Sequence, residues 1–476
     1  MKKRIFLLAA FVLVFVVAEA QNVAHARGMK FDDDSYGKVP RKAALLTRDY
    51  EVLPASWSLK RYCPIPNDQG QFGTCTSWST AYAARTIAEA VKNGWTDRNR
   101  ITSEAFSPIF VYKQIEFTKT PNCEEGTCID DALDLLMDKG VPKFRDFNVK
   151  CADYIPADLF PKALSYTIED YCTLFGSFDG YSKKILSVKK SLTQNCPVLI
   201  GMKVPDSFDY AKDVWVKKEN NNDGGGHAMC VVGYDDNKYG GAMLIMNSWG
   251  TLWGNGGFTW VKYRDFADNV KYAYEMILNV KTEPKPMPAP VPVPQPVVVK
   301  NKFSGKLRFH LSTGQDMKPV LTTVGTDKVY RMQGSYISGT RYRLYLSNNT
   351  PAYVYVLSSD LQNNTSVLFP PDASVSAALV YSSNDIALPD EKWFIEMDKT
   401  LGTDMVCVLY SKEKIDIDAF VAKIKGMGGT FCQRVRTALA SKAVSPADVR
   451  YDSSNIIFNA ESSNVVVPLF VEIKHI

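Results

Sequence analysis

Histidine is scarce in this sequence, since the 476 residues include only four of them. His25 lies near the N-terminus, and His310 and His475 follow a proline-rich segment, so His227 is the one histidine of the central region. Histidine is the side chain that most often serves as a general base near neutral pH. Any such chemistry in the central region is therefore expected at His227.

The sequence also lacks long apolar runs, basic blocks and zinc-binding spacings. The apolar run at 5–17 is shorter than the ~20 residues that a membrane-spanning helix needs. The net charge is +5, and no basic block with interleaved aromatic residues occurs, which argues against nucleic-acid binding. No Cys-x2-Cys or His-x3-His spacing is present, which argues against a zinc site.

Residues 1–20 have the pattern of a cleaved export signal. Positions 2–4 are basic, the apolar run follows, and Ala18-Glu19-Ala20 supplies small residues before a cleavage site at Gln21. A membrane anchor is the alternative, which the short apolar run disfavours. We expect an exported bacterial protein, periplasmic or extracellular, with no membrane span in the mature chain.

Ten cysteines in an exported chain favour disulfide bonds. Cys123 with Cys128, and Cys151 with Cys172, are plausible local pairs, but spacing alone does not fix the connectivity.

The chain is too long for one ordinary core, so two or three domains are expected. From 284 to 296 proline occupies every second position, which favours a polyproline II spacer. The expected parts are a signal peptide (1–20), a short N-terminal arm or minimal propeptide (21–52), a first domain (53–282), a proline-rich linker (283–300) and a β-rich accessory domain (301–476).

Hydrophobic periodicity predicts an α+β protein. In the first domain a helical half precedes a β half, with helices at 76–93, 108–117 and 129–139 and strands at 197–202, 228–234, 242–247 and 257–263. The accessory domain is predicted to be a mainly β, sandwich-like domain, with strands at 307–311, 342–346, 353–357, 393–396, 405–410 and 465–472 and helices at 416–427 and 434–441.

Three short motifs carry candidate chemistry. A glycine-punctuated loop at 67–75 ends in Cys75, at the N-terminus of the first predicted helix, where backbone N–H groups favour a thiolate. A run of glycines precedes His227 and apolar β-formers follow it, which indicates a loop entering a buried strand. Twenty residues further on, Asn247 could accept a hydrogen bond from the imidazole and fix its tautomer.

The order Gln-(five residues)-Cys, then Gly-His-Ala, then Asn-Ser-Trp-Gly resembles the papain-like cysteine peptidases, over roughly 53–280. The resemblance implies a helical lobe and a β-barrel-like lobe with the cleft between them. It makes Cys75 the nucleophile, His227 the general base and acid, and Asn247 the residue that orients His227. Gln69 would donate to the oxyanion beside the Cys75 backbone N–H, and Trp249 would shield the His–Asn hydrogen bond from water.

Substrate contacts follow from the same resemblance. Gly126 would pair with the substrate main chain, and Gly201 and Gly226 would line the pocket for the residue before the scissile one, with room for a bulky apolar group. Glu125 stands where the family has a glycine. Its acidic side chain would favour basic substrates, or it simply belongs to a solvated surface.

Two further departures from the family pattern concern the loop around the nucleophile. Thr76 replaces the usual tryptophan after the nucleophile, which should alter packing rather than chemistry. Phe72 replaces a cysteine, so the disulfide that usually ties this loop cannot form.

Segment 21–52 is shorter than the helical propeptide that papain-like enzymes usually carry across the cleft. It could cross the active site as a minimal inhibitor, but an arm packed on the surface is the preferred interpretation. The accessory domain resembles an uncharacterised bacterial β-sandwich family that is often appended to peptidases and kinases, and its partner is not predicted.

These features predict an exported cysteine endopeptidase that acts on protein or peptide substrates and needs no cofactor or metal. The alternative is a catalytically silent papain-like scaffold that binds peptides or proteins, with a targeting accessory domain. A third interpretation keeps the thiol chemistry but assigns it to amide transfer or cell-wall peptides. The intact set Gln69, Cys75, His227 and Asn247 favours catalysis.

Overall fold

The computed structural model describes residues 25–43, 53–115, 122–217, 224–278, 300–360, 364–380, 384–390 and 392–476. The predicted export signal, and the predicted linker apart from residue 300, lie outside these ranges. Within them, no helix is both long enough and apolar enough to cross a membrane.

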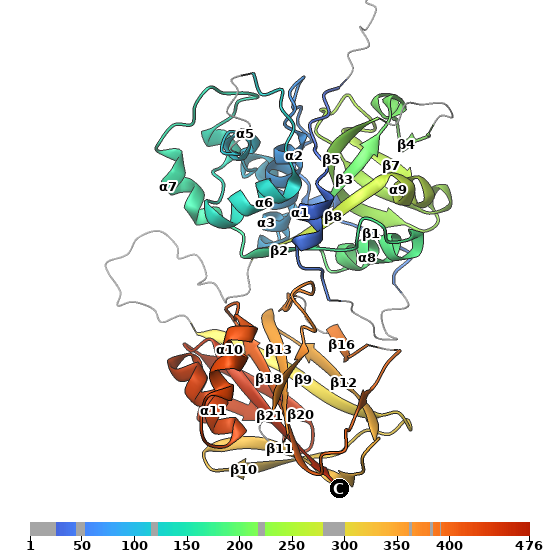
Figure 1. The fold of residues 1–476 in the computed structure, drawn as a ribbon. Helices are drawn as coiled ribbons and strands as arrows, with labels where there is room; N and C mark the ends of the chain where they lie inside the picture. Colours follow the sequence, from blue (N-terminus) through green and yellow to red (C-terminus); the bar gives the residue numbers. More distant parts are fainter. Residues whose placement is uncertain are drawn as a thin grey trace, which may run out of the picture.

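The helical lobe is built on the helix that begins at Cys75 (Figure 1). This helix has three parts: α2 (Cys75–Ser77), a π-helical stretch η3 (Trp78–Arg85) and α3 (Thr86–Asn93). Gly94 ends it in the left-handed region at φ 65°, so the helix predicted at 76–93 and its terminator are confirmed. The π-helical stretch is fully buried, and such stretches are frequent next to functional sites.

The other helices that precede the C-terminal domain are shorter than this one, and α1 belongs to the N-terminal arm. The helix predicted at 108–117 is confirmed only in its first part, because α5 ends at Tyr112, whereas the helix predicted at 129–139 matches α6 closely. The helices are α1 (Asp33–Lys38), α4 (Arg98–Ser103), α5 (Pro108–Tyr112), α6 (Ile129–Asp138), α7 (Leu159–Ala163), α8 (Tyr181–Thr193) and α9 (Tyr263–Asn269).

The β lobe is one mostly antiparallel sheet in the order β2-β8-β3-β5-β6-β7-β4, with β1 paired to β5. Its strands are β1 (Ser56–Ser58), β2 (Asp170–Thr173), β3 (Val198–Val204), β4 (Val214–Trp215), β5 (Gly225–Asp235), β6 (Ala242–Met246), β7 (Phe258–Lys262) and β8 (Val270–Ile277). The four predicted strands correspond to β3, β5, β6 and β7. Strand β5 lies between β3 and β6, and its apolar residues after His227 are buried.

The C-terminal domain is a sandwich of two sheets with two helices on one outer face (Figure 1). One sheet has the order β10-β11-β21-β18-β13-β14 with β15 beside β13, and the other has the order β16-β12-β9-β20-β19 with β17 beside β12. Side chains alternate along β13, so that Val354 and Val356 pack between the sheets while Tyr353 and Leu357 pack under the helices.

The strands of this domain are β9 (Asn301–Leu311), β10 (Pro319–Val324), β11 (Asp327–Tyr336), β12 (Arg341–Asn348), β13 (Ala352–Ser359), β14 (Thr365–Phe369), β15 (Ala378–Leu379), β16 (Asn384–Leu388), β17 (Ile395–Glu396), β18 (Gly402–Ser411), β19 (Val449–Tyr451), β20 (Ile456–Ser462) and β21 (Val466–His475). Its helices are α10 (Ile417–Lys425) and α11 (Phe431–Leu439). Every strand and helix predicted from the sequence is present, although the strand predicted at 393–396 shrinks to β17.

The disulfide bond joins Cys123 to Cys151, with the Cα atoms 5.9 Å apart. The local pairs that spacing suggested are therefore wrong. Cys128 is the residue that precedes α6, and Cys172 is buried in β2 of the other lobe. The bond instead ties the loop before α6 to the loop at 151.

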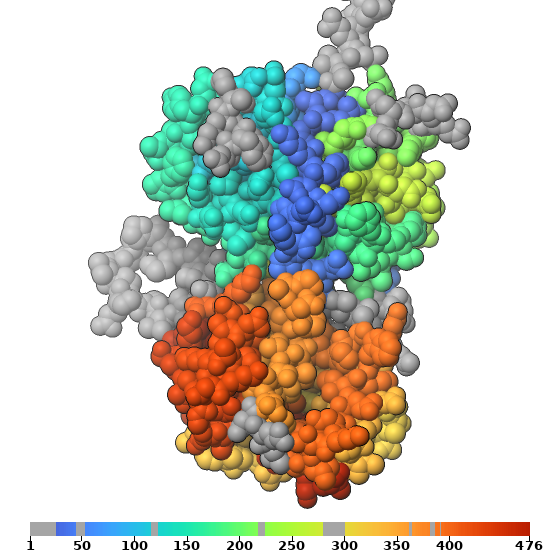
Figure 2. Space-filling view, in the orientation of Figure 1, coloured from blue at the N-terminus to red at the C-terminus, as the bar shows by residue number. Residues whose placement is uncertain are grey.

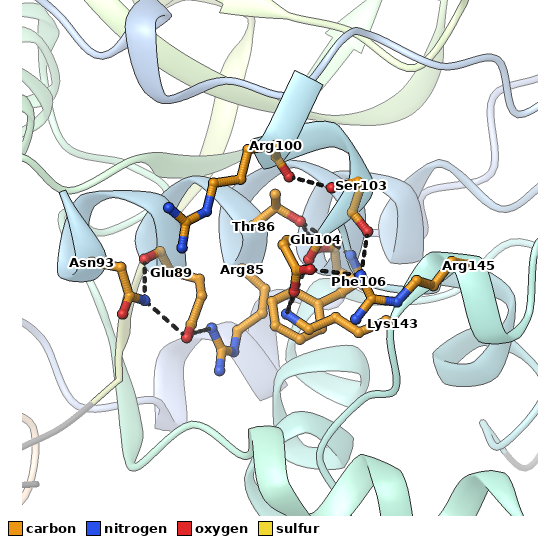
Figure 3. Close-up of polar contacts among 11 residues, drawn as sticks. Arg85, Thr86, Glu89, Asn93, Arg100, Ser103, Glu104, Phe106, Lys143 and Arg145 are labelled. Atoms are coloured by element: carbon orange, nitrogen blue, oxygen red, sulfur yellow. Dashed lines mark hydrogen bonds and ion pairs between the residues drawn. The ribbon is translucent and has the colours of Figure 1, made fainter. Parts of the chain in front are cut away.

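A buried charge network links the helix that begins at Cys75 to residues 104–106 and 143 of the helical lobe. Figure 3 shows Arg85 and Lys143 meeting around the ring of Phe106, with the charged groups 4.5 Å and 3.9 Å from its centroid. Arg85 pairs with Glu89 at 2.6 Å, and Lys143 pairs with Glu104 at 3.4 Å. Because Lys143 is only 3 % exposed, burial lowers the pKa of its ammonium to about 8 despite the carboxylates.

The lowered pKa of Lys143 gives a testable dependence of stability on pH. Between about pH 8 and the ordinary lysine value of 10.5, the unfolded state binds more protons than the folded state. The penalty for burying the charge is therefore fully present below pH 8 and is relieved as the pH rises. The unfolding free energy of the protein minus that of Lys143→Met should rise by up to about 3 kcal/mol across this window. Urea unfolding at several pH values measures it.

The matched control is Lys139→Met, because Lys139 is an exposed lysine at the end of α6. The unfolding free energy of the unsubstituted protein minus that of Lys139→Met should stay constant over the same pH range. A flat difference for Lys143→Met would contradict the buried-charge assignment.

Candidate active site

Cys75 is the first residue of α2 and is fully buried at the boundary between the helical lobe and the sheet. Its sulfur accepts a hydrogen bond from the backbone N–H of Gly28 at 3.3 Å. The backbone of Ala228, next to His227 in β5, also hydrogen-bonds the thiol. Cys75 of the first motif therefore lies next to β5, the strand that carries His227 of the second motif.

His227 is held from two sides. Its Nε2 lies 2.8 Å from Oδ1 of Asn247, and its ring stacks on Trp249 at a centroid distance of 4.5 Å. An Nε2–H that donates to the amide oxygen leaves Nδ1 as the basic nitrogen. Nδ1 is buried and has no hydrogen-bond partner among the described residues, so it can take the proton of a thiol.

Gln69 is fully buried, and its side chain spans the loop before Cys75. The amide nitrogen donates to the carbonyls of Phe72 at 2.8 Å and Ala26 at 3.2 Å, while Oε1 accepts from the Ser248 hydroxyl at 2.6 Å. An amide held with its N–H₂ toward a peptide carbonyl is the arrangement that an oxyanion donor needs. Ser248 is therefore a positioning residue, which the Asn-Ser-Trp-Gly motif contained but sequence reasoning did not single out.

The N-terminal arm, residues 25–43, lies between the two lobes and covers this site. Figure 2 shows it as the blue strip between the helical half and the β half. His25 stacks on Trp249 at 4.5 Å, the arm backbone at Gly28 lies on Cys75, and Tyr36 stacks on Tyr272 at 4.2 Å. The preferred interpretation of a surface-packed arm is therefore wrong. Residues 25–31 contact both walls of the cleft.

Backbone hydrogen bonds fix this part of the arm to both lobes. Thr127 N–H donates to Gly28 O at 2.8 Å and Lys30 N–H donates to Thr127 O at 2.9 Å, which is a parallel bridge centred on Met29. On the other wall, Met29 N–H donates to Gly226 O at 3.1 Å. The arm pairs with Thr127, while Gly126 provides close approach, because a Cβ there would lie 2.5 Å from Gly28 O. Pairing of Gly126 with a substrate main chain stays a prediction.

The glycines predicted to line a pocket do so around Met29. A Cβ on Gly201 would lie 2.2 Å from the Met29 methyl carbon, and a Cβ on Gly226 would lie 2.3 Å from Met29 O. The ring of Phe31 borders the same space. The pocket therefore holds an unbranched apolar side chain in this structure.

Two basic side chains of the arm form ion pairs with acidic side chains of the cleft. Arg27 pairs at 2.9 Å with Asp209, whose side chain is only 9 % exposed, and Lys30 pairs at 3.0 Å with Glu125 at the surface. Asp209 follows Phe208, whose ring contacts Trp249, so it lies on the Trp249 side of His227. Sequence reasoning missed Asp209, because a single aspartate in a loop gives no signal.

The covered site holds its two reactive groups neutral. Burial raises the pKa of the Cys75 thiol, although hydrogen bonds from backbone groups partly oppose it. Burial also lowers the pKa of His227 to about 3, against the Asn247 hydrogen bond. The helix N-terminus was expected to favour the thiolate, but in the closed site desolvation is the larger effect.

A serine, a histidine and an aspartate also lie together in the C-terminal domain. Ser338 Oγ is 3.1 Å from His475 Nε2, and His475 Nδ1 is 3.5 Å from Asp404 Oδ2. The N–H groups of Gly339 and Thr340 are already bonded to carbonyls, so the turn after Ser338 offers no oxyanion donors. Burial raises the pKa of Asp404. We assign no reaction to this group.

Residues 54–278 match the sequence model of the papain family cysteine proteases, and residues 335–414 match a domain of unknown function, DUF4384. An uncharacterized peptidase C1-like protein of Acanthamoeba polyphaga mimivirus is 26 % identical over 265 residues, which cover 49 % of this chain and 77 % of that protein. Peptidase 1 of Dermatophagoides farinae is 23 % identical over 205 residues, or 42 % of this chain and 57 % of that protein.

Among solved structures, xylellain, a cysteine protease from Xylella fastidiosa, is 20 % identical with a TM-score of 0.44, covering 53 % of this chain and 96 % of that one. With the family match and the fold described above, the first domain belongs to the papain family of cysteine proteases. The C-terminal region carries the DUF4384 domain.

The hydrogen bond from Ser248 to Gln69 predicts a graded effect on turnover. Removing an oxyanion donor typically costs ~2.7–4 kcal/mol of barrier, so Gln69→Ala should lower kcat by about two to three orders of magnitude. Ser248→Ala leaves the Gln69 amide in place but removes the hydrogen bond that orients it, so kcat should fall by less. Steady-state kinetics on a peptide substrate measures kcat for both variants, in a protein whose arm has been displaced from the cleft.

The double variant Gln69→Ala/Ser248→Ala should be no slower than Gln69→Ala alone, because Ser248 acts through the amide. Additive losses would contradict that role.

Proposed function

We propose that this protein is an exported cysteine endopeptidase whose own N-terminal arm keeps it latent. The carrying observation is that the Cys75 thiol hydrogen-bonds the backbone of Ala228, the residue after His227, whose ring is paired with Asn247, while the Gln69 amide donates to a peptide carbonyl of the arm. In the open site Cys75 attacks a peptide carbonyl and His227 takes the thiol proton. His227 then protonates the leaving amine, and water releases the acyl group.

The direction of the arm explains why it is an inhibitor rather than a substrate. Its N-terminal end lies on Trp249 and Met29 follows in the Gly201 pocket. A substrate whose acyl residues fill that pocket, and whose leaving group lies toward Trp249, runs the opposite way. In the arm, Cys75 therefore meets the N–H of Gly28 rather than a carbonyl carbon.

A silent binding scaffold is the competing function, and the arm argues against it. A cleft that had lost its chemistry would have no need of a segment that excludes water from the thiol. Amide transfer and cell-wall peptides remain open as variants of the same chemistry at Cys75.

A single methyl group should open the site. A Cβ on Gly28 would lie 1.9 Å from Gly73 O, so Gly28→Ala should displace the arm beside Cys75. Overpacking of this kind costs ~1–3 kcal/mol, which corresponds to about a ten- to hundredfold faster reaction of Cys75 with a thiol-directed epoxide peptide. Intact-protein mass spectrometry follows the labelling. The matched control is Gly37→Ala, because a Cβ on Gly37 meets nothing within 4 Å.

Labelling of the Gly28→Ala protein should disappear in Cys75→Ala and fall sharply in His227→Ala. If Cys75 stays unlabelled in Gly28→Ala, and also in a chain that starts near residue 53, the protein is not a cysteine peptidase. The silent scaffold then stands.

Asp209 gives a test of substrate choice. We propose that it binds a basic side chain on the leaving-group side of the scissile bond, as it binds Arg27 of the arm. Hydrogen bonds to a charged partner are worth ~1.5–3 kcal/mol. In the Gly28→Ala background, Asp209→Asn should therefore lower kcat/KM about tenfold or more for peptides with arginine at that position. Peptides with alanine there serve as the control, and an equal loss for both series would rule out this role.

A further inference from the structure

Residues 40–43 of the arm contact both domains. The segment 40–43 lies along β2, which is the edge strand of the β lobe. Thr173 N–H donates to Pro40 O at 3.0 Å and Lys42 N–H donates to Thr173 O at 2.8 Å. This is a parallel bridge between Arg41 and Thr173, so the arm extends the sheet of the papain-like domain by one short strand.

The opposite edge of the same segment is bound by the C-terminal domain. Arg41 N–H donates to Ser374 O at 2.6 Å, and Ser376 N–H donates to Arg41 O at 2.7 Å. A second parallel bridge thus joins Arg41 to Val375. The peptide groups of the arm alternate in direction, so one residue is held by β2 and by segment 374–376 at the same time.

Side chains reinforce both edges. Ala43 is 6 % exposed and packs with the core of the C-terminal sandwich. Lys42 pairs at 2.7 Å with Glu275 of β8, whose side chain is 1 % exposed. The contact therefore combines apolar burial in one domain with a buried ion pair in the other.

The two domains also touch without the arm. Lys414 pairs at 3.0 Å with Asp170 of β2, and Ile277, at the end of β8, packs among apolar residues of the C-terminal domain. The C-terminal domain is thus seated at the β2 and β8 end of the first domain, where the arm leaves the cleft. Figure 2 shows the blue arm running down to the orange domain at this point.

We propose that the C-terminal domain is the anchor of the inhibitory arm: segment 374–376 binds arm residues 40–43 by strand addition and thereby keeps residues 25–31 over Cys75. This function of the DUF4384-containing domain rests on the proposed latency of the peptidase for its biological meaning, but the contact itself does not. Loosening the C-terminal domain would raise the rate at which the arm leaves the cleft.

Two substitutions in the full-length chain test the anchor. Ala43→Glu places a charge in the apolar contact with the sandwich, and Ser376→Pro removes the N–H that donates to Arg41 O. Loss of a hydrogen bond or of such packing should speed epoxide labelling of Cys75 about tenfold. The matched control is Gly37→Glu, which adds the same charge to the arm at an exposed position without neighbours, and it should label as slowly as the unsubstituted protein.

Hydrogen exchange of the arm amides gives a readout that does not depend on catalysis. The N–H groups of Met29 and Lys30 are bonded to Gly226 and Thr127, and they should exchange faster in Ala43→Glu and Ser376→Pro but not in Gly37→Glu. Near-ultraviolet circular dichroism checks that the sandwich stays folded in each variant.

The outcomes separate the two proposals. If Gly28→Ala labels quickly while both anchor variants keep slow labelling and slow exchange, the peptidase stands and the anchor is overturned. If Cys75 labels in no variant but the arm amides exchange faster in both anchor variants, the anchor stands and the peptidase function fails.

Discussion

The approach of the arm backbone at Gly28 to the loop at Gly73, directly beside the Cys75 sulfur, is the contact on which the closed structure depends. A Cβ on Gly28 would lie 1.9 Å from Gly73 O, and a Cβ on Gly73 would lie 2.3 Å from Glu124 O. Glycine on both sides lets three backbone segments stack at the nucleophile. Because no side chains separate these segments, the arm backbone excludes water from the thiol. The N–H of Gly28 contacts the thiol in its place.

Exclusion of water in turn decides the charge state of the site. A thiolate–imidazolium pair needs either solvent or fixed dipoles, and the closed cleft offers Cys75 only a few backbone donors. The same geometry that orients His227 through Asn247 and Trp249 therefore stores a neutral pair while the arm is bound. In the proposed function, departure of the arm would readmit water and favour the ion pair. Latency and activation would then differ in solvation rather than in the arrangement of the side chains.

Local signals in the sequence were enough to predict the helix after Cys75 and the buried strand after His227. Each depends on residues within about ten positions of one another, where spacing and turn chemistry are informative. The catalytic roles of Cys75, His227 and Asn247 stay predictions. Apolar patterns also placed six strands of the sandwich, but β10, β11, β14, β15, β16, β19 and β20 were not predicted. The other failures are long-range: the Cys123–Cys151 pair, and the path of the arm.

The path of the arm could not be inferred from residues 25–31, because they show no helical or alternating pattern. The partners of Met29, which are Thr127, Gly201 and Gly226, lie 98 to 197 positions away from it in the chain. The glycines at 201 and 226 did predict a pocket. They could not say that the chain itself fills it, since a substrate side chain needs the same space.

The two ends of the arm reinforce each other. Residues 25–31 are held by the cleft and residues 40–43 by the edge between the domains, with Tyr36 of α1 packed against Tyr272 between them. When one end is bound, the other is kept at a high effective concentration near its site, so the pair of contacts holds far better than either alone. A cut in the chain between residues 43 and 53 would leave all of these contacts in place. In the proposed latent state both ends of the arm hold residues 25–31 over Cys75, so weakening either end should speed opening of the cleft.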